Sequence, residues 1–108
     1  MSYNILSIEP FDRQLKRLQK KYPSLKSEMA ALIQTLEENP FRGVPLVNSC
    51  YKIRVAIAGK GRGKSGGARV ISYVQIVENT VYLLSIYDKS KAETIADKQI
   101  DNLLKLIE

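Results

Sequence analysis

The chain has 108 residues, of which 44% are hydrophobic and 26% are charged, as in an ordinary globular protein. This length leaves no room for a second domain, so we expect a single domain over residues 1–108. The absence of histidine excludes histidine-based acid–base catalysis, and the single cysteine excludes an internal disulfide and a Cys/His zinc site. The net charge of +6 is uneven, because residues 39–77 hold seven Lys or Arg and no Asp or Glu, which favours a polyanionic partner.

The sequence contains no signal for a membrane. Its apolar runs are all shorter than the ~18 residues that span a bilayer. The first residues lack the basic region and the long apolar region of a signal peptide. A single cysteine suits a reducing compartment. We therefore expect a cytoplasmic protein with no membrane partner.

The first forty residues predict a strand and two helices. Residues 3–8 are expected to form a short strand, and Pro10 suits the first turn of a helix. Apolar residues then recur with helical spacing in two stripes, separated by Pro23 and by Ser24, a candidate N-cap. Asn39 and Pro40 end the second helix. Because the connection is so short, we expect an antiparallel helical hairpin.

The second half predicts three strands and a last helix. Residues 41–50 are expected to be a loop, and residues 51–58 a strand with alternating faces. Residues 68–77 are apolar on both faces, which favours a central strand, and a tight turn at residues 78–79 leads to a strand over 81–87. Ser90 to Glu93 form a capping-box pattern, which predicts the start of the C-terminal helix. Its expected buried face is Ala96, Ile100, Leu103, Leu104 and Ile107.

These elements predict an α+β fold of the order β-α-α-β-β-β-α. The antiparallel sheet has about four strands, with the first strand added at an edge. The helical hairpin covers one face of this sheet.

Residues 59–67 form a cationic glycine-rich loop. Residues 58–65 match a relaxed phosphate-binding P-loop pattern, but two glycines and a strand follow them, where a true P-loop starts a helix. Clustered cations repel one another unless a partner's phosphates neutralise them. We therefore interpret Lys60, Arg62 and Lys64 as nucleic-acid contacts, with a solvated hairpin connection as the alternative.

A second group of cations is expected on the sheet. Lys52 and Arg54 are two residues apart on one strand, so they leave the same face. Arg69 begins the neighbouring strand, and Lys89 follows the last one. Together they predict a cationic cleft, with ordinary solvated charges as the alternative. The basic face of the first helix is interpreted as solvated, or else as binding RNA or an acidic partner, and Cys50 as structural.

The order of these motifs resembles the RelE/ParE superfamily of toxins from bacterial type II toxin–antitoxin systems. The strand at residues 50–54, the Gly-Gly-Ala-Arg-Val run at residues 66–70 and the Tyr-Asp-Lys-Ser run at residues 87–90 carry the resemblance. The run that leads to Arg69 is most similar to the HigB/RelE-like branch. The resemblance covers nearly the whole chain.

The resemblance implies an mRNA endoribonuclease that cuts codons in the ribosomal A site, uses no metal or other cofactor, and is held inactive by a cognate antitoxin protein. Carried across, Lys52 and Arg54 match the family's basic pair, Arg69 the arginine opening the next strand, and Lys89 the later cation. Some RelE-type toxins carry a functional tyrosine in the last helix, where this chain has residues 93–95. Tyr87 is the candidate substitute.

We hypothesise that the ribose 2′-hydroxyl attacks the adjacent phosphate, with Arg54 and Arg69 stabilising the developing charge. Lys52 is the candidate base, and Tyr87 or Lys89 the candidate acid. Two alternatives stay open: a ParE-like inhibitor of DNA gyrase, and a non-catalytic basic RNA-binding module.

Overall fold

The computed structural model describes residues 2–58, 67–92 and 94–107. The predicted α+β order is confirmed, with small additions between the second helix and the next strand. In chain order the elements are β1 (Asn4–Ser7), α1 (Glu9–Lys21), α2 (Leu25–Glu38), β2 (Val44–Pro45), a short 3₁₀ turn (Val47–Ser49), β3 (Cys50–Val55), β4 (Ala68–Gln75), β5 (Thr80–Asp88) and α3 (Asp97–Leu104). No helix in these ranges combines the length and the apolar character needed to cross a membrane.

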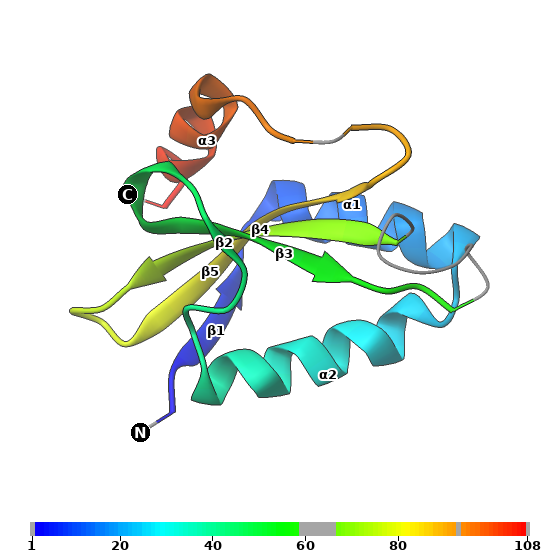
Figure 1. Cartoon of the computed structure of the whole chain (residues 1–108), viewed down its shortest axis with the longest axis horizontal. Helices are drawn as coiled ribbons and strands as arrows, with labels where there is room; N and C mark the ends of the chain where they lie inside the picture. The colour runs from blue at the N-terminus through cyan, green and yellow to red at the C-terminus, as the bar shows by residue number, and fades with distance from the viewer. Residues whose placement is uncertain (1, 59–66, 93, 108) are drawn as a thin grey trace.

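The strands form one sheet in the order β1-β5-β4-β3-β2 (Figure 1). β1 lies at an edge, parallel to β5, and the other neighbouring pairs are antiparallel. β4 is central, as its apolar residues on both faces predict. The fifth strand, β2, has two residues and falls in the segment expected to be a loop. Pro45 is tolerated there because an edge strand has one side without ladder bonds.

Helices cover both faces of the sheet. One hydrophobic cluster joins the sheet to α1 through Phe11 and to α2 through the buried side chains Leu25, Met29, Leu32 and Leu36. A second cluster lies on the opposite face, where Ile100 of α3 packs with Cys50, Ile71 and Leu84. Figure 1 shows α2 and α3 on opposite sides of the sheet, with the chain returning along α2 after α1. The predicted helical hairpin on one face is therefore confirmed.

Two strands end two or three residues earlier than predicted. β3 ends at Val55 because its partner strand β4 begins at Ala68, and beyond it the main-chain N–H of Ala58 donates to Glu28 Oε2 of α2 at 2.9 Å. β4 ends at Gln75, and the turn begins at Ile76. This turn closes through Asn79, which has a left-handed φ of 51° and donates its N–H to the oxygen of Ile76.

The prediction that the last helix begins at Ser90 is wrong. α3 begins at Asp97, and the described residues from 90 to 96 are not helical. Ser90 does not cap a helix, because its main-chain N–H and its Oγ both donate to Asp88 Oδ1, at 2.9 and 2.8 Å. Gln99 Oε1 accepts the N–H of Ala96 instead, which fixes the first turn of α3. Ile100 is buried and Leu103, Leu104 and Ile107 pack beside it as predicted, while Ala96 is exposed.

Cys50 should be inert in the folded protein. Burial, and secondarily the charge of Asp101, raises the pKa of its thiol from 9.0 to about 11. At pH 8 the thiolate fraction should then be roughly 100-fold lower than in the unfolded chain, so alkylation by iodoacetamide should be slower by at least that factor. Mass spectrometry of labelled native and urea-unfolded protein would measure this ratio. A Ser49→Cys, Cys50→Ala variant, with its thiol at an exposed position, should label rapidly, and equal rates for native and unfolded Cys50 would contradict the assignment.

Candidate functional site

Three of the predicted site residues lie side by side across the sheet. In the antiparallel register Arg54 of β3 is opposite Arg69 of β4, and Arg69 is opposite Tyr87 of β5. Directly opposed residues on neighbouring strands project from the same face, so the three side chains form a row. We call these residues, Arg54, Arg69 and Tyr87, the cross-strand row.

The row lies on the α3 face of the sheet, at the end where β4 begins and β5 ends. Cys50 and Lys52 share this face of β3 with Arg54, because the three residues are two positions apart, and Cys50 belongs to the cluster beneath α3. Lys52 is half-buried and lies opposite Ile71, two residues before Arg54 of the row. The register therefore brings Lys52, Arg54 and Arg69 to one face of the sheet.

The two arginines of the row have different environments. Arg69 is only 4% exposed, and its Nη1 donates to the main-chain oxygen of Ala68 at 3.1 Å. Arg54 is exposed. A buried guanidinium has a restricted orientation, whereas an exposed one can adjust to a ligand. Arg69 is thus the fixed cation of the row and Arg54 the adaptable one.

Gly67 permits the close approach of β3 and β4 at this end of the sheet. Its φ is +89°, and a Cβ atom there would lie 2.3 Å from the main-chain oxygen of Val55. The Gly67 oxygen also accepts the N–H of Lys89 at 3.0 Å, which extends the β4–β5 pairing past Asp88. Gly67 therefore brings together the end of β3, the start of β4 and the residue after β5, all beside the row.

Tyr87 and Lys89 are placed at the end of β5. Tyr87 packs against the second hydrophobic cluster, and its hydroxyl oxygen is shielded from solvent. Lys89 is half-buried, and its backbone is anchored to Gly67. The predicted loop contacts Lys60, Arg62 and Lys64 lie outside the described residues.

Sequence reasoning missed two features next to the row. One is Asp88, a buried carboxylate between Tyr87 and Lys89. The Asp-Lys-Ser order in the sequence could have indicated this role, because an aspartate two residues before a serine often accepts the hydrogen bonds of a turn. The other is a hollow between α1 and the end of β5, lined by Arg17, Lys21 and Lys91 together with Tyr87 and Asp88. Part of the basic face of α1 thus borders the candidate site.

Gln14, which also lines this hollow, binds α1 to the edge of β5. Its Oε1 accepts both the Oγ–H of Ser85 and the N–H of Ile86, each at 3.0 Å. β1 pairs with β5 only as far as Leu83, so a glutamine replaces a neighbouring strand at this point. The side-chain amide therefore satisfies a sheet edge and sets the position of α1 beside Tyr87.

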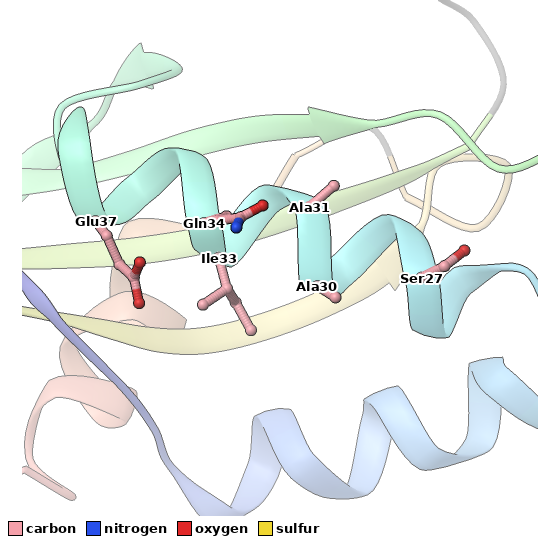
Figure 2. Close-up of a pocket in the computed structure, with 6 residues that line it drawn as sticks. All are labelled: Ser27, Ala30, Ala31, Ile33, Gln34 and Glu37. Atoms are coloured by element: carbon pink, nitrogen blue, oxygen red, sulfur yellow. The ribbon is translucent and has the colours of Figure 1, made fainter.

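A wider hollow lies on the outer surface of α2, away from the row. Figure 2 shows that its six lining residues all come from this helix: Ser27, Ala30, Ala31, Ile33, Gln34 and Glu37. No cation is among them, and Glu37 is acidic. This hollow is unsuited to phosphate, so the cation-bearing face of the sheet is the better candidate for an anionic ligand.

The described residues offer no evident ligand set for a metal. Within residues 2–58, 67–92 and 94–107, no three Cys, Asp or Glu side chains gather closely enough to hold an ion. The row offers guanidinium and phenol groups, and Lys52 beside it adds an ammonium group. Guanidinium groups bind the paired oxygens of a phosphate and stabilise charge that builds there.

No known family model matches the sequence. Among solved structures, an arginine-to-alanine double mutant of E. coli toxin RelE in the free state is similar, with a TM-score of 0.60 and 21% identity over 86% of this chain and 90% of that chain. The isolated E. coli RelE toxin aligns with a TM-score of 0.56 and 18% identity over 99% of this chain and 100% of that chain. The intact E. coli RelBE toxin–antitoxin complex gives a TM-score of 0.47 and 20% identity over 79% and 94%.

The architecture is thus an α+β fold in which a helical hairpin and a C-terminal helix enclose an antiparallel meander. Its fold is similar to that of the E. coli RelE structures, as the resemblance implied. At these identities the similarity concerns the fold, and the assignment to the HigB-like branch stays a prediction.

Replacing Gly67 by alanine should destabilise the protein. The new Cβ would clash with the Val55 oxygen, and an alanine at a φ of +89° is strained, so we expect a loss of at least about 1 kcal/mol. Thermal unfolding followed by circular dichroism would measure it. Ala31→Ser on the exposed surface of α2 is the control and should change stability by less than about 0.5 kcal/mol. An unchanged melting temperature for Gly67→Ala would contradict the packing described here.

Proposed function

We propose that this protein is the toxin of a type II toxin–antitoxin system and acts as a ribosome-dependent mRNA endoribonuclease. The observation that carries the proposal is the cross-strand row, which sets a buried arginine between an exposed arginine and a tyrosine, with Lys52 on the same face. The RelE-like fold supports it, since the resemblance matches the two arginines of the row to family positions, while Tyr87 is the candidate substitute for the family's tyrosine.

The proposed reaction is transesterification within the mRNA. The ribose 2′-oxygen attacks the adjacent phosphorus, the bond from phosphorus to the 5′-oxygen of the next nucleotide breaks, and a 2′,3′-cyclic phosphate and a 5′-hydroxyl result. Negative charge builds on the non-bridging oxygens as the attack proceeds. Arg69, fixed by burial, and Arg54, beside it in the row, stabilise this charge.

Proton transfer is assigned to the remaining groups of the site. Lys52 takes the proton from the 2′-hydroxyl, and Tyr87 or Lys89 gives one to the leaving 5′-oxygen. Lys52 lies one step along β3 from Arg54, whereas Tyr87 is at the opposite end of the row on β5. A base and an acid on opposite sides of the phosphate suit an in-line displacement.

We propose two macromolecular partners. The substrate is mRNA in the ribosomal A site, and a cognate antitoxin protein holds the toxin inactive. The uneven positive charge, with seven cations and no acidic residue in positions 39–77, suits both a nucleic acid and an acidic antitoxin segment. Lys60, Arg62 and Lys64 are proposed to guide RNA toward the row.

Two other functions compete with this one. A ParE-like gyrase inhibitor requires no phosphate chemistry, so it gives no reason for a buried arginine in the row. A non-catalytic RNA-binding module explains the positive charge but not the burial of Arg69, because binding that depends on salt uses exposed cations. The position of Arg69 therefore favours the endoribonuclease.

Replacing Arg69 should abolish most of the cleavage. Arg69→Ala should lower the rate on translating ribosomes by about 10²–10³-fold, the usual cost of removing one preorganised donor to a developing charge. Arg69→Lys keeps the charge but loses the paired donors, so its rate should be intermediate. Arg13→Ala removes an arginine that pairs with Glu9 on the exposed surface of α1 and should cleave at the wild-type rate. A folded Arg69→Ala protein with wild-type activity would refute the assignment.

The three functions differ in what induction does to cells. The endoribonuclease predicts in-frame mRNA 5′ ends that disappear when translation is blocked, which sequencing of 5′ ends would detect. Loss of plasmid supercoiling without new mRNA ends would instead indicate gyrase inhibition. Salt-sensitive RNA binding with intact mRNA would indicate the non-catalytic module.

A further inference from the structure

Asp88 is a buried carboxylate at the point where β5 ends. It is 5% exposed and stands between Tyr87 and Lys89, two residues that the proposed reaction uses. Aspartate is rarely buried unless its oxygens are hydrogen-bonded, because removing a carboxylate from water costs several kcal/mol. The bonds that Asp88 makes therefore indicate what it does.

Its side chain joins the turn after β5 to the end of α1. Oδ1 accepts the main-chain N–H of Ser90 at 2.9 Å and the Ser90 Oγ–H at 2.8 Å. On the other side, Oδ2 accepts the Tyr22 hydroxyl at 3.5 Å, a longer contact, and Tyr22 is the residue that caps α1. The two short bonds fix the turn, and the longer contact keeps the turn against the helical hairpin.

The main chain of Asp88 closes the same turn. Its oxygen accepts the N–H of Lys91 at 2.9 Å and that of Ala92 at 3.3 Å. The N–H of Lys89 donates to the oxygen of Gly67, two residues before Arg69 on the neighbouring segment of chain. Lys89 is therefore held on one side by Gly67 and on the other by the turn that Asp88 organises. In Figure 1 the chain leaves β5 at this end of the sheet and returns to α3, so the turn also sets where the return begins.

We propose that Asp88 is a positioning residue for RNA cleavage: it holds Tyr87 and Lys89 in place relative to Arg69. This inference rests on the proposed endoribonuclease function. It requires no contact between Asp88 and RNA. The carboxylate acts by placing an acceptor oxygen at a set distance from the backbone, where it binds both donors of Ser90. Its negative charge is not required for the chemistry.

Three substitutions separate position from charge. Asp88→Asn keeps an oxygen acceptor at the same distance from the backbone and removes the charge. Asp88→Glu keeps the charge but moves the acceptor outward by one methylene, which displaces the turn. Asp88→Ala removes the acceptor. A positioning role predicts that asparagine rescues the activity and that glutamate does not, whereas an electrostatic role predicts the reverse.

The experiment measures kcat and KM for cleavage of one mRNA on purified translating ribosomes, for the wild type and the three variants. A displacement of about 1 Å in a reacting group can cost 10²-fold, so Asp88→Ala and Asp88→Glu should lose up to about 10²-fold in kcat with KM changed less than about twofold. Asp88→Asn should stay within about fivefold of wild type. Asp12→Ala, an exposed aspartate of α1, is the control and should leave both constants unchanged.

Each outcome decides the matter. Wild-type kcat in folded Asp88→Glu and Asp88→Ala proteins, or a large loss in Asp88→Asn with activity kept in Asp88→Glu, would overturn the inference. If Asp88→Ala does not fold, the Asp88→Asn and Asp88→Glu pair still gives the answer. If the wild type itself fails to cut mRNA, the proposed function is wrong and this inference falls with it, and the wild-type arm of the same assay identifies that case.

Discussion

The register of the three central strands is the constraint on which the candidate site depends. β4 is buried on both faces between β3 and β5, so a slip of one residue would exchange its two apolar faces and place Arg69 among the side chains beneath the helical hairpin. Burial of Val70 and Val74 on one side and Ile71 on the other therefore fixes where Arg69 projects. The cross-strand row is a consequence of how the core packs.

The shared face of Lys52, Arg54 and Arg69 could be predicted from the sequence, because the alternation of side chains along a strand determines which residues share a face. Lys52 and Arg54 alternate with Ile53 and Val55, so their shared face follows from the period of two, and Arg69 follows from the antiparallel hairpin. The helical hairpin was equally predictable from its apolar stripes. The roles of these residues in catalysis, and the loop cations at residues 60–64, stay predictions.

The start of the last helix was predicted wrongly because local hydrogen bonds compete with the capping pattern in the sequence. Ser90 matches a helix cap in sequence, but Asp88 lies nearer to it and takes its donors, so α3 begins at Asp97. Ile76 and Val77 are apolar, which favours a strand, yet they lie in the turn. β2 is too short to produce an alternation that could be recognised. Gln14 and Tyr22 could not be linked to β5 from sequence, because their contacts span 66–72 positions along the chain.

The parallel pairing of β1 with β5 bears on how the protein folds during its own synthesis. Asn4 leaves the ribosome well before its partner Thr80, which follows 76 positions later. β1 therefore cannot join the sheet until most of the chain has been made, and Tyr87 completes the row later still. The cross-strand row is therefore assembled only after β3, β4 and β5 have all been made, so a nascent chain that stops before β5 carries an incomplete row.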